Sequence, residues 1–425
     1  MSEGARPARA PEPSSVYAFV DDFVDEGIAS VADLLAAHGF GGASLATVYH
    51  AARDVLPHNP KRAVVHRDEG VHYFEPDASC YRGPLRPQRG NTETGGFEQV
   101  TSALADRGLW WQAWTVYLHN CRLANAHPSC AVTNAFGDVY ITDLCPSNAD
   151  VATYAVDLTT DVARLRPSLV VAESLHHAGF GHGYHHERSF VDVPAVTAFL
   201  LSLCFCAACI ERADVDGQAL AGSVRDIVRG SLAGTTSLPD RVDRDGLADV
   251  VGPELAGYLA ARERTVAAVV AECAAAAHSE DVPFGFMDQT GALKGYVTGE
   301  PTGPVAAADA WQLGIDPAAV SAVSDSYIAL TYAKDPDRVR LDAAAYASAI
   351  DPNASLRCVL RHGRPDSTGI DDLRLKVSAI GAAGGATDFY HYGLMPLAGL
   401  AAASQAIAAA SEALGTARDG ASTGS

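Results

Sequence analysis

Long apolar runs and clusters of basic residues are both missing from this chain of 425 residues. No stretch reaches the roughly 18 consecutive apolar residues that a membrane-spanning helix needs. Lysine and arginine number 31 against 51 aspartates and glutamates, which gives a formal net charge of -20. Because a nucleic-acid groove or an anionic membrane surface attracts clustered positive charge, we expect no nucleic acid and no membrane as partner. The charge favours a small or neutral molecule instead.

Signals for secretion and for a disulfide framework are also lacking. Residues 1–15 are rich in proline, alanine and serine and contain no apolar segment of the kind found in signal peptides. The chain has nine cysteines, an odd number that fits reduced thiols better than paired ones. We therefore expect a cytoplasmic protein, with a disordered N-terminal tail at 1–15 and a flexible C-terminal tail at 416–425. Nothing in the sequence indicates an oligomeric state.

What the chain does contain is a regular alternation of short apolar runs and helical segments. The expected strands are 16–23, 43–50, 111–120, 169–175, 282–288, 323–332, 355–363 and 387–393. The expected barrel helices include 28–38, 97–107, 150–165, 339–350, 370–383 and 397–414. Eight such units close a (β/α)8 TIM barrel, an α/β fold whose chemistry lies at the carboxyl ends of the strands. We predict one barrel domain over 16–415, with a helical insertion at 192–280 after the fourth strand.

A histidine-rich stretch follows the fourth predicted strand. The apolar run 169–172 leads into Glu173, and five of the 15 histidines fall within residues 176–186. Since an apolar strand buries its side chains, a carboxylate at its end requires an explanation. We interpret Glu173 as catalytic and the loop as functional. The alternative is a hydrogen-bonded structural glutamate beside a solvated loop.

Polar and aromatic side chains gather where the predicted strands end. The expected substrate-binding residues are Asp21, Asp22, His50, Tyr117, His119, Asn120, His177, His182, Tyr332, Arg361, Tyr390 and Tyr392. Aromatic rings stack on the apolar faces of sugar rings, and acids and amides hydrogen-bond to sugar hydroxyls. No GxGxxG follows the first strand, so a dinucleotide or phosphate site is not indicated. These residues favour a saccharide, either a small molecule or an oligosaccharide.

Glycoside hydrolysis commonly uses two carboxyl groups, one protonated and one ionised. Asp288, which ends the fifth strand, and Asp366, which follows the seventh, are the candidate partners of Glu173. Asp325 is the weakest candidate because it lies near the wrong end of its strand. Apolar surroundings raise the pKa of a carboxyl, whereas arginines such as Arg361 lower it, so Glu173 fits an acid and Asp366 a base or nucleophile. A separation of about 5–5.5 Å would imply retention and about 6.5–9.5 Å inversion.

Several motifs together resemble those of uncharacterised bacterial glycoside-hydrolase-like (β/α)8 barrel proteins. They are LCPSNADVATY at 144–154, Glu173 at the end of its strand, CFCAAC shortly after it, and DFYHYG in the last strand. The chain is more distantly similar to barrel β-galactosidases and α-fucosidases. This resemblance implies a TIM barrel and a hydrolase acting on glycosyl bonds.

The chain departs from the large clan of retaining glycosidases at two positions. Ala172 stands where that clan has an asparagine before the acid/base glutamate, and Arg361 and His362 stand where its nucleophile ends strand seven. In the fucosidase-like pattern, by contrast, the carboxylate of the fourth strand is the nucleophile. The resemblance therefore leaves the role of Glu173 open.

Metal chemistry is the main alternative to carboxylate catalysis. Cys204, Cys206 and Cys209 form CxCxxC, which supplies three of the four ligands of a zinc site; residues 176–186 could supply a fourth. We expect buried thiols and no cofactor, with zinc as the alternative. The histidine loop could serve a metal-dependent sugar isomerase or lyase, although HExxH spacing is absent. A third hypothesis is a non-catalytic barrel that binds saccharide.

Overall fold

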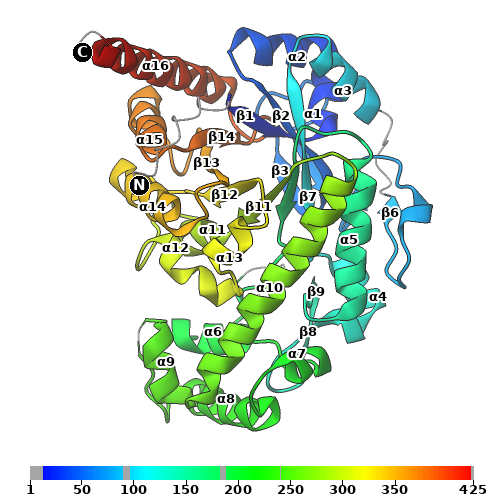
Figure 1. The fold of residues 1–425 in the computed structure, drawn as a ribbon, viewed down its shortest axis with the longest axis vertical. Coiled ribbons are helices and arrows are strands. Elements are labelled where there is room, and N and C mark those ends of the chain that lie inside the picture. Colours follow the sequence, from blue (N-terminus) through cyan, green and yellow to red (C-terminus); the bar gives the residue numbers. More distant parts are fainter. Residues whose placement is uncertain (1–12, 90–95, 182–187, 240, 423–425) are drawn as a thin grey trace, which may run out of the picture.

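In a computed structural model, which describes residues 13–89, 96–181, 188–239 and 241–422, eight parallel strands close into a barrel (Figure 1). The strands are β1 (Ser15–Ala18), β2 (Gly42–Tyr49), β7 (Trp110–Val116), β10 (Val170–Glu173), β11 (Phe284–Asp288), β12 (Ser326–Leu330), β13 (Ser355–Arg361) and β14 (Ala386–Tyr390). Closure is complete because β1 pairs in parallel with both β14 and β2. The predicted (β/α)8 TIM barrel is confirmed.

Each strand is buried on both faces, as a parallel barrel strand should be. All eight residues of β2 and all four of β10 are buried. Near the amino ends of the strands, the barrel interior holds a small polar layer. There the Ser44 hydroxyl contacts that of Ser15 at 2.9 Å and donates to the amide oxygen of Gln112 at 2.9 Å. Towards the carboxyl ends of the strands, aromatic rings line the barrel interior in place of these polar side chains.

Helices surround the barrel on its outside (Figure 1). They are α2 (Ile28–Ala37), α3 (Phe97–Ala105), α5 (Ala149–Ala163), α10 (Glu254–Ser279), α14 (Pro336–Ala349), α15 (Ile370–Ala382) and α16 (Leu397–Ser422). The amide oxygen of Asn148 accepts from the backbone N–H groups of residues 150 and 151, which fixes the start of α5. The last helix runs to Ser422 rather than to the predicted residue 414. The predicted tail at 1–15 lies outside the described residues up to position 12, and β1 already begins at Ser15.

The first strand is shorter than predicted, and this changes where two acidic residues lie. We expected a strand over 16–23, but β1 ends at Ala18 and helix α1 (Val20–Glu26) begins almost at once. Asp22 causes the change, because its carboxylate accepts from the backbone N–H of Phe19 at 2.8 Å and so occupies a free donor at the helix start. Asp21 and Asp22 therefore belong to a helix and not to a strand end.

Short elements extend the barrel at the carboxyl ends of β2 and β7. The hairpin β3 (Ala52–Val55) and β4 (Val64–Arg67) follows β2, together with β5 (Val71–His72) and β6 (Gln88–Arg89). Helix α4 (Cys121–Ala126) and the hairpin β8 (Ala131–Thr133) and β9 (Val139–Leu144) follow β7. The long loops of the sequence thus carry structure of their own at the mouth of the barrel.

The predicted helical insertion contains α6 (Ala195–Ser202), α7 (Ala207–Arg212), α8 (Gly217–Leu232) and α9 (Arg244–Val251), which lie together below the barrel in Figure 1. Together with the start of α10, they form a second apolar core that includes Val196, Leu200, Val224 and Leu255. The long helix α10 joins the two cores, because Tyr258 packs in the second core and Val270 in that of the barrel. Among the described residues, no helix combines the length and the apolar character that crossing a membrane requires.

Candidate functional site

A cavity of about 420 Å³ opens at the carboxyl ends of the barrel strands. Its wall combines aromatic rings and aliphatic side chains around one carboxylate. The wall includes Tyr17, Tyr49, His50, Trp114, Glu173, Gln289, Lys294, Tyr296, Tyr332 and Tyr390. Rings from β1, β2, β7 and β14 contact one another; for example, the Tyr49 and Trp114 centroids lie 4.7 Å apart in an edge-on arrangement. Such a wall suits a ligand with apolar faces and hydroxyl edges.

Glu173 ends β10 and faces this cavity, with only 8% of its surface exposed. The indole N–H of Trp114 donates to Oε2, and the amide of Gln289 donates to Oε1 at 2.8 Å. Burial raises the pKa of Glu173 from its ordinary 4.5 to about 7, against the lowering effects of the Trp114 hydrogen bond and of the charge on His119. A carboxyl with this pKa can both donate and accept a proton near neutral pH.

The residue after Glu173 helps to hold the site. Ser174 has a φ of +56°, a left-handed conformation that non-glycine residues rarely adopt. In this conformation its hydroxyl donates to the amide oxygen of Gln289 at 2.8 Å. The amide orientation of Gln289 is thereby set, with its NH2 directed to Glu173. The strained turn after β10 thus fixes the carboxyl through a second residue.

Two tyrosines complete the wall opposite these groups. The hydroxyls of Tyr49 and Tyr390 lie 3.3 Å apart. Burial raises the pKa of each phenol well above 10, so both are neutral hydrogen-bonding groups. The guanidinium of Arg361 lies 4.5 Å from the ring centroid of Tyr332 and 5.0 Å from that of Tyr296, which supports this side of the wall by cation–π contacts.

The two predicted catalytic partners of Glu173 are held elsewhere. Asp288 is fully buried and accepts from the backbone N–H of Thr290 at 2.8 Å and from the hydroxyl of Tyr327 at 2.7 Å. Asp366 forms a bidentate ion pair with Arg361, in which Nε and Nη2 of the arginine each donate to one carboxylate oxygen at 2.7 Å. Neither aspartate lines the cavity, and Glu173 is the one carboxylate in its described wall. The structure does not support the expected placement of a second carboxyl there.

The predicted binding residues fall into distinct groups. His50, Tyr332 and Tyr390 line the cavity, and Arg361 supports it from behind. His119 lies just outside: its ring is 4.8 Å from that of His50, and Nδ1 lies 3.1 Å from the carboxylate of Asp143. It borders a small neighbouring cavity of about 30 Å³ together with Ser174 and Gln289.

Four other predicted residues do not reach the cavity or cannot be placed. The Tyr117 hydroxyl contacts that of Thr159 in α5 at 2.8 Å, so the side chain faces the helical layer. The amide oxygen of Asn120 accepts from the backbone of Leu123 at 3.0 Å and starts α4. His177 is buried away from the cavity wall. His182 belongs to residues 182–187, which lie outside the described part of the chain, as do His185, His186 and Glu187.

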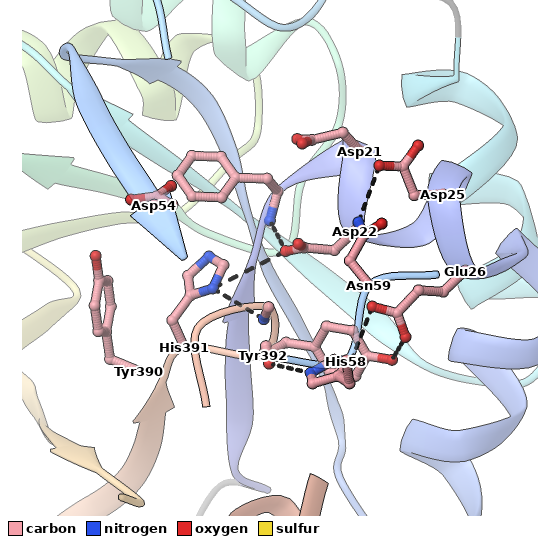
Figure 2. Close-up of polar contacts among 12 residues, drawn as sticks. Asp21, Asp22, Asp25, Glu26, Asp54, His58, Asn59, Tyr390, His391 and Tyr392 are labelled. Atoms are coloured by element: carbon pink, nitrogen blue, oxygen red, sulfur yellow. Dashed lines mark hydrogen bonds and ion pairs between the residues drawn. The ribbon is translucent and has the colours of Figure 1, made fainter. Parts of the chain in front are cut away.

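Asp21, Asp22 and Tyr392 belong to a second polar cluster, beside α1 (Figure 2). Burial raises the pKa of Asp22 to about 8, with the charge of Asp21 acting in the same direction. His391 lies 3.9 Å from Asp22, and burial holds its pKa well below 6.5, so both side chains are uncharged near neutral pH. Tyr390 lines the cavity, but Tyr392 donates to Glu26 at 2.8 Å within the cluster.

A third feature is a cluster of four cysteines. The sulfurs of Cys145, Cys204, Cys206 and Cys209 all lie within 4.8 Å of one another. The zinc alternative to buried thiols drew a fourth ligand from residues 176–186, whereas the structure places Cys145, which directly follows β9, beside the other three cysteines. Within the described ranges, no other group of three or more His, Cys, Asp or Glu side chains has a geometry suited to a metal ion.

Three residues of these sites were not predicted from the sequence: Trp114, Gln289 and Cys145. Gln289 comes directly after Asp288, which ends its strand, so its place at the mouth of the barrel could have been predicted from the sequence. Trp114 and Gln112 alternate along β7, the spacing that directs both into the barrel. Cys145 was present in the quoted LCPSN motif, but the long sequence separation from 204–209 hid its proximity.

No protein-family model and no curated protein matches this chain. Solved structures with the same fold include the β-amylase catalytic domain from Paenibacillus polymyxa, at 11% identity and a TM-score of 0.53 over 93% of this chain and 97% of that one. A β-galactosidase from Marinomonas ef1 matches at 11% identity and a TM-score of 0.54, over 96% of this chain and 60% of that one. α-L-Fucosidase isoenzyme 2 from Paenibacillus thiaminolyticus matches at 9% identity and a TM-score of 0.50, over 93% and 48%. These likenesses establish the fold.

Proposed function

We propose that this protein is a carbohydrate-active enzyme that hydrolyses glycosidic bonds, with Glu173 as its proton donor. The observation that carries the proposal is the setting of Glu173: its pKa is about 7, and its carboxyl faces an aromatic cavity at the mouth of the barrel. Catalysis by a positioned acid works best when its pKa lies near the working pH.

In this mechanism a saccharide stacks on the tyrosine and tryptophan rings, and protonated Glu173 lies beside the glycosidic oxygen. The carboxyl donates its proton to that oxygen as the bond from the oxygen to the anomeric carbon breaks. The N–H groups of Trp114 and Gln289 then stabilise the carboxylate that remains. This proton transfer needs no cofactor.

Attack at the anomeric carbon is assigned to water. The described wall offers no second carboxylate, and the raised pKa values of Tyr49 and Tyr390 keep both phenols protonated. Water adds its oxygen to the anomeric carbon and releases a proton to solvent or to the carboxylate of Glu173. The proposed reaction therefore depends on one carboxyl acid rather than on a carboxyl pair.

The fold supports this class by analogy alone. The similar structures are a β-amylase, a β-galactosidase and an α-L-fucosidase, each of which acts on a glycoside. The formal charge of -20 and the aromatic wall suit a neutral small saccharide or oligosaccharide better than nucleic acid.

Turnover of a broad panel of aryl glycosides and oligosaccharides, measured with wild type and Glu173→Gln, tests the proposal. We expect hydrolysis of at least one member, abolished in Glu173→Gln while saccharide binding by calorimetry persists. Glu300→Gln is the control, because Glu300 is an exposed surface partner of Lys334. Saccharide binding without turnover by wild type would establish the non-catalytic barrel instead. An isomerase or lyase activity on sugars that is lost when a chelator removes metal would establish the metal-dependent alternative.

A further inference from the structure

We propose that Cys145, Cys204, Cys206 and Cys209 hold a zinc ion as four thiolates, and that the buried guanidinium of Arg262 balances the charge of this centre. The site lies between the β8–β9 hairpin and the helical insertion, apart from the cavity of Glu173. The inference is independent of the proposed glycosidase activity.

The four sulfur atoms already have a geometry that suits a metal ion. Cys145 lies 3.4 Å from Cys209 and 3.6 Å from both Cys204 and Cys206, measured between sulfur atoms. A disulfide would require about 2.05 Å, so these are separate thiols. A tetrahedral zinc ion with Zn–S bonds of about 2.3 Å places its sulfurs about 3.8 Å apart. The four sulfurs, all within 4.8 Å of one another, are thus already arranged around one point.

A buried arginine on α10 lacks hydrogen-bond partners for part of its guanidinium. Arg262 lies on α10, and only 2% of its surface is exposed. Nη2 donates to the carbonyl of Gln312 at 3.2 Å, whereas Nε and Nη1 have no hydrogen-bond partner among the described residues. One turn earlier on the same helix, the Tyr258 hydroxyl donates to the carbonyl of Cys204. A buried guanidinium with unpaired N–H groups is costly unless an anion lies nearby.

The charge of Arg262 is opposite to that of a zinc ion held by four thiolates. Four thiolates around Zn²⁺ carry a net charge of -2, and a guanidinium returns +1. Arg262 follows Tyr258 by one turn and so lies on the same face of α10, the face from which the Tyr258 hydroxyl reaches Cys204. Burial lowers the pKa of Arg262, and the charges of Cys209, Tyr258, Cys204 and Cys145 act against this effect. With four neutral thiols, Arg262 would be a buried cation without an ion-pair partner among the described residues. With a tetrathiolate centre, it has one.

The site fits a structural role. Four protein sulfurs fill all four positions of a tetrahedral ion and leave none for water or substrate. Its ligands come from the end of β9 and from the α6–α7 region, so the ion would fasten the second core to the loop that follows β7. Polynuclear iron–sulfur clusters interpose several atoms between their cysteines, which disfavours them for sulfurs this close.

Elemental analysis of the purified full chain is the first test. We expect one zinc per wild-type chain and loss of that zinc in Cys206→Ser. Cys273→Ser is the matched control, because Cys273 is a buried thiol on α10 outside the cluster, and it should retain the zinc. Wild-type protein that lacks zinc after reconstitution, or that carries iron instead, would overturn the proposal, and this result does not depend on any variant folding.

The role of Arg262 is tested by the rate at which zinc passes to a competing chelator. We expect Arg262→Met to release zinc at least about ten-fold faster than wild type, the usual cost of losing a group that supports metal ligands. Arg262→Lys keeps the charge and should stay closer to wild type. If Arg262 does not balance the charge of the zinc centre, Arg262→Met only removes a buried positive charge that has no partner. The melting temperature of the variant would then rise, and its rate of zinc release would equal that of wild type. Should Arg262→Met not fold, the comparison of Arg262→Lys with wild type and the zinc content of Cys206→Ser and Cys273→Ser decide the site.

Discussion

The amide of Gln289 donates a 2.8 Å hydrogen bond to Oε1 of Glu173 and so joins the carboxyl ends of neighbouring strands β11 and β10. Because the amide oxygen of Gln289 is occupied by the Ser174 hydroxyl, its NH2 group can point only to the carboxyl. Trp114 holds the other oxygen. Each carboxyl oxygen thus has one fixed donor and keeps a lone pair for a ligand or a proton.

Replacing Glu173 by glutamine tests whether its proton matters. Glutamine keeps the shape but cannot protonate a leaving group, so we predict a fall in kcat of about 10²–10⁴-fold, the usual contribution of general acid–base catalysis. The melting temperature should fall, because the NH2 of the glutamine must face Trp114 or Gln289, each of which already directs an N–H donor to this position. Steady-state kinetics and calorimetry measure both effects. Near-wild-type kcat would reduce Glu173 to a structural acid.

Asp366 is predicted to stabilise the fold rather than to act in catalysis. Asp366→Asn leaves the buried guanidinium of Arg361 without its two-pronged partner. Breaking such a pair costs about 3–5 kcal/mol, so the denaturant midpoint should fall clearly. Asp337→Asn, which breaks an exposed pair with Arg340, should cost less than about 1 kcal/mol. A stable Asp366→Asn protein without activity would restore Asp366 as a catalytic candidate.

The sequence predicted the barrel well because strand and helix periodicity are local properties. The eight strands and the position of Glu173 at a strand end could both be predicted from neighbouring residues. The first strand was predicted too long because its apolar run continues through Phe19 and Val20, whereas a hydrogen bond from the backbone N–H of Phe19 to Asp22 turns the chain into a helix.

The candidate site was only partly predictable, because strand-end position does not fix side-chain direction. Tyr390 and Tyr392 are two residues apart, yet the first lines the cavity and the second contacts Glu26. Asp288 ends its strand as expected but turns to Tyr327. The meeting of Cys145 with 204–209 depends on tertiary contact between two loops, which no local pattern reveals.

Asp22 should make stability depend on pH in a defined direction. Its pKa rises from 3.8 to about 8 in the folded protein, so the folded state binds the proton more tightly than the unfolded state. The resulting stability is present below pH 3.8 and is lost as pH rises to about 8, by up to about 1.4 kcal/mol per pH unit. Asn at position 22 does not ionise. The stability of Asp22→Asn relative to wild type should therefore increase from pH 4 to pH 8.

Asp25, on the same helix, provides a control of opposite sign. Burial raises the pKa of Asp25, but hydrogen bonds from Arg62 and Asn59 outweigh this effect and lower it overall. Asp25→Asn should therefore lose stability relative to wild type as pH rises through the range where Asp25 ionises. Denaturant midpoints of both variants across the pH range measure the two slopes. Parallel slopes for the two variants would contradict the assignment of Asp22 as a buried, protonated acid.

The pH dependence of kcat/KM tests the role of Glu173 as an acid. A proton donor with a pKa of about 7 must be protonated to act, so activity should decline as pH rises above about 7. The Trp114 hydrogen bond lowers that pKa, so Trp114→Phe should move the alkaline limb to higher pH. A hydrogen bond to a charged group is worth about 1.5–3 kcal/mol, which corresponds to a shift of about one to two pH units. Trp110→Phe, at the opposite end of β7, should leave the limb in place. A limb that moves to lower pH in Trp114→Phe, or does not move, would show that the limb reports a different group.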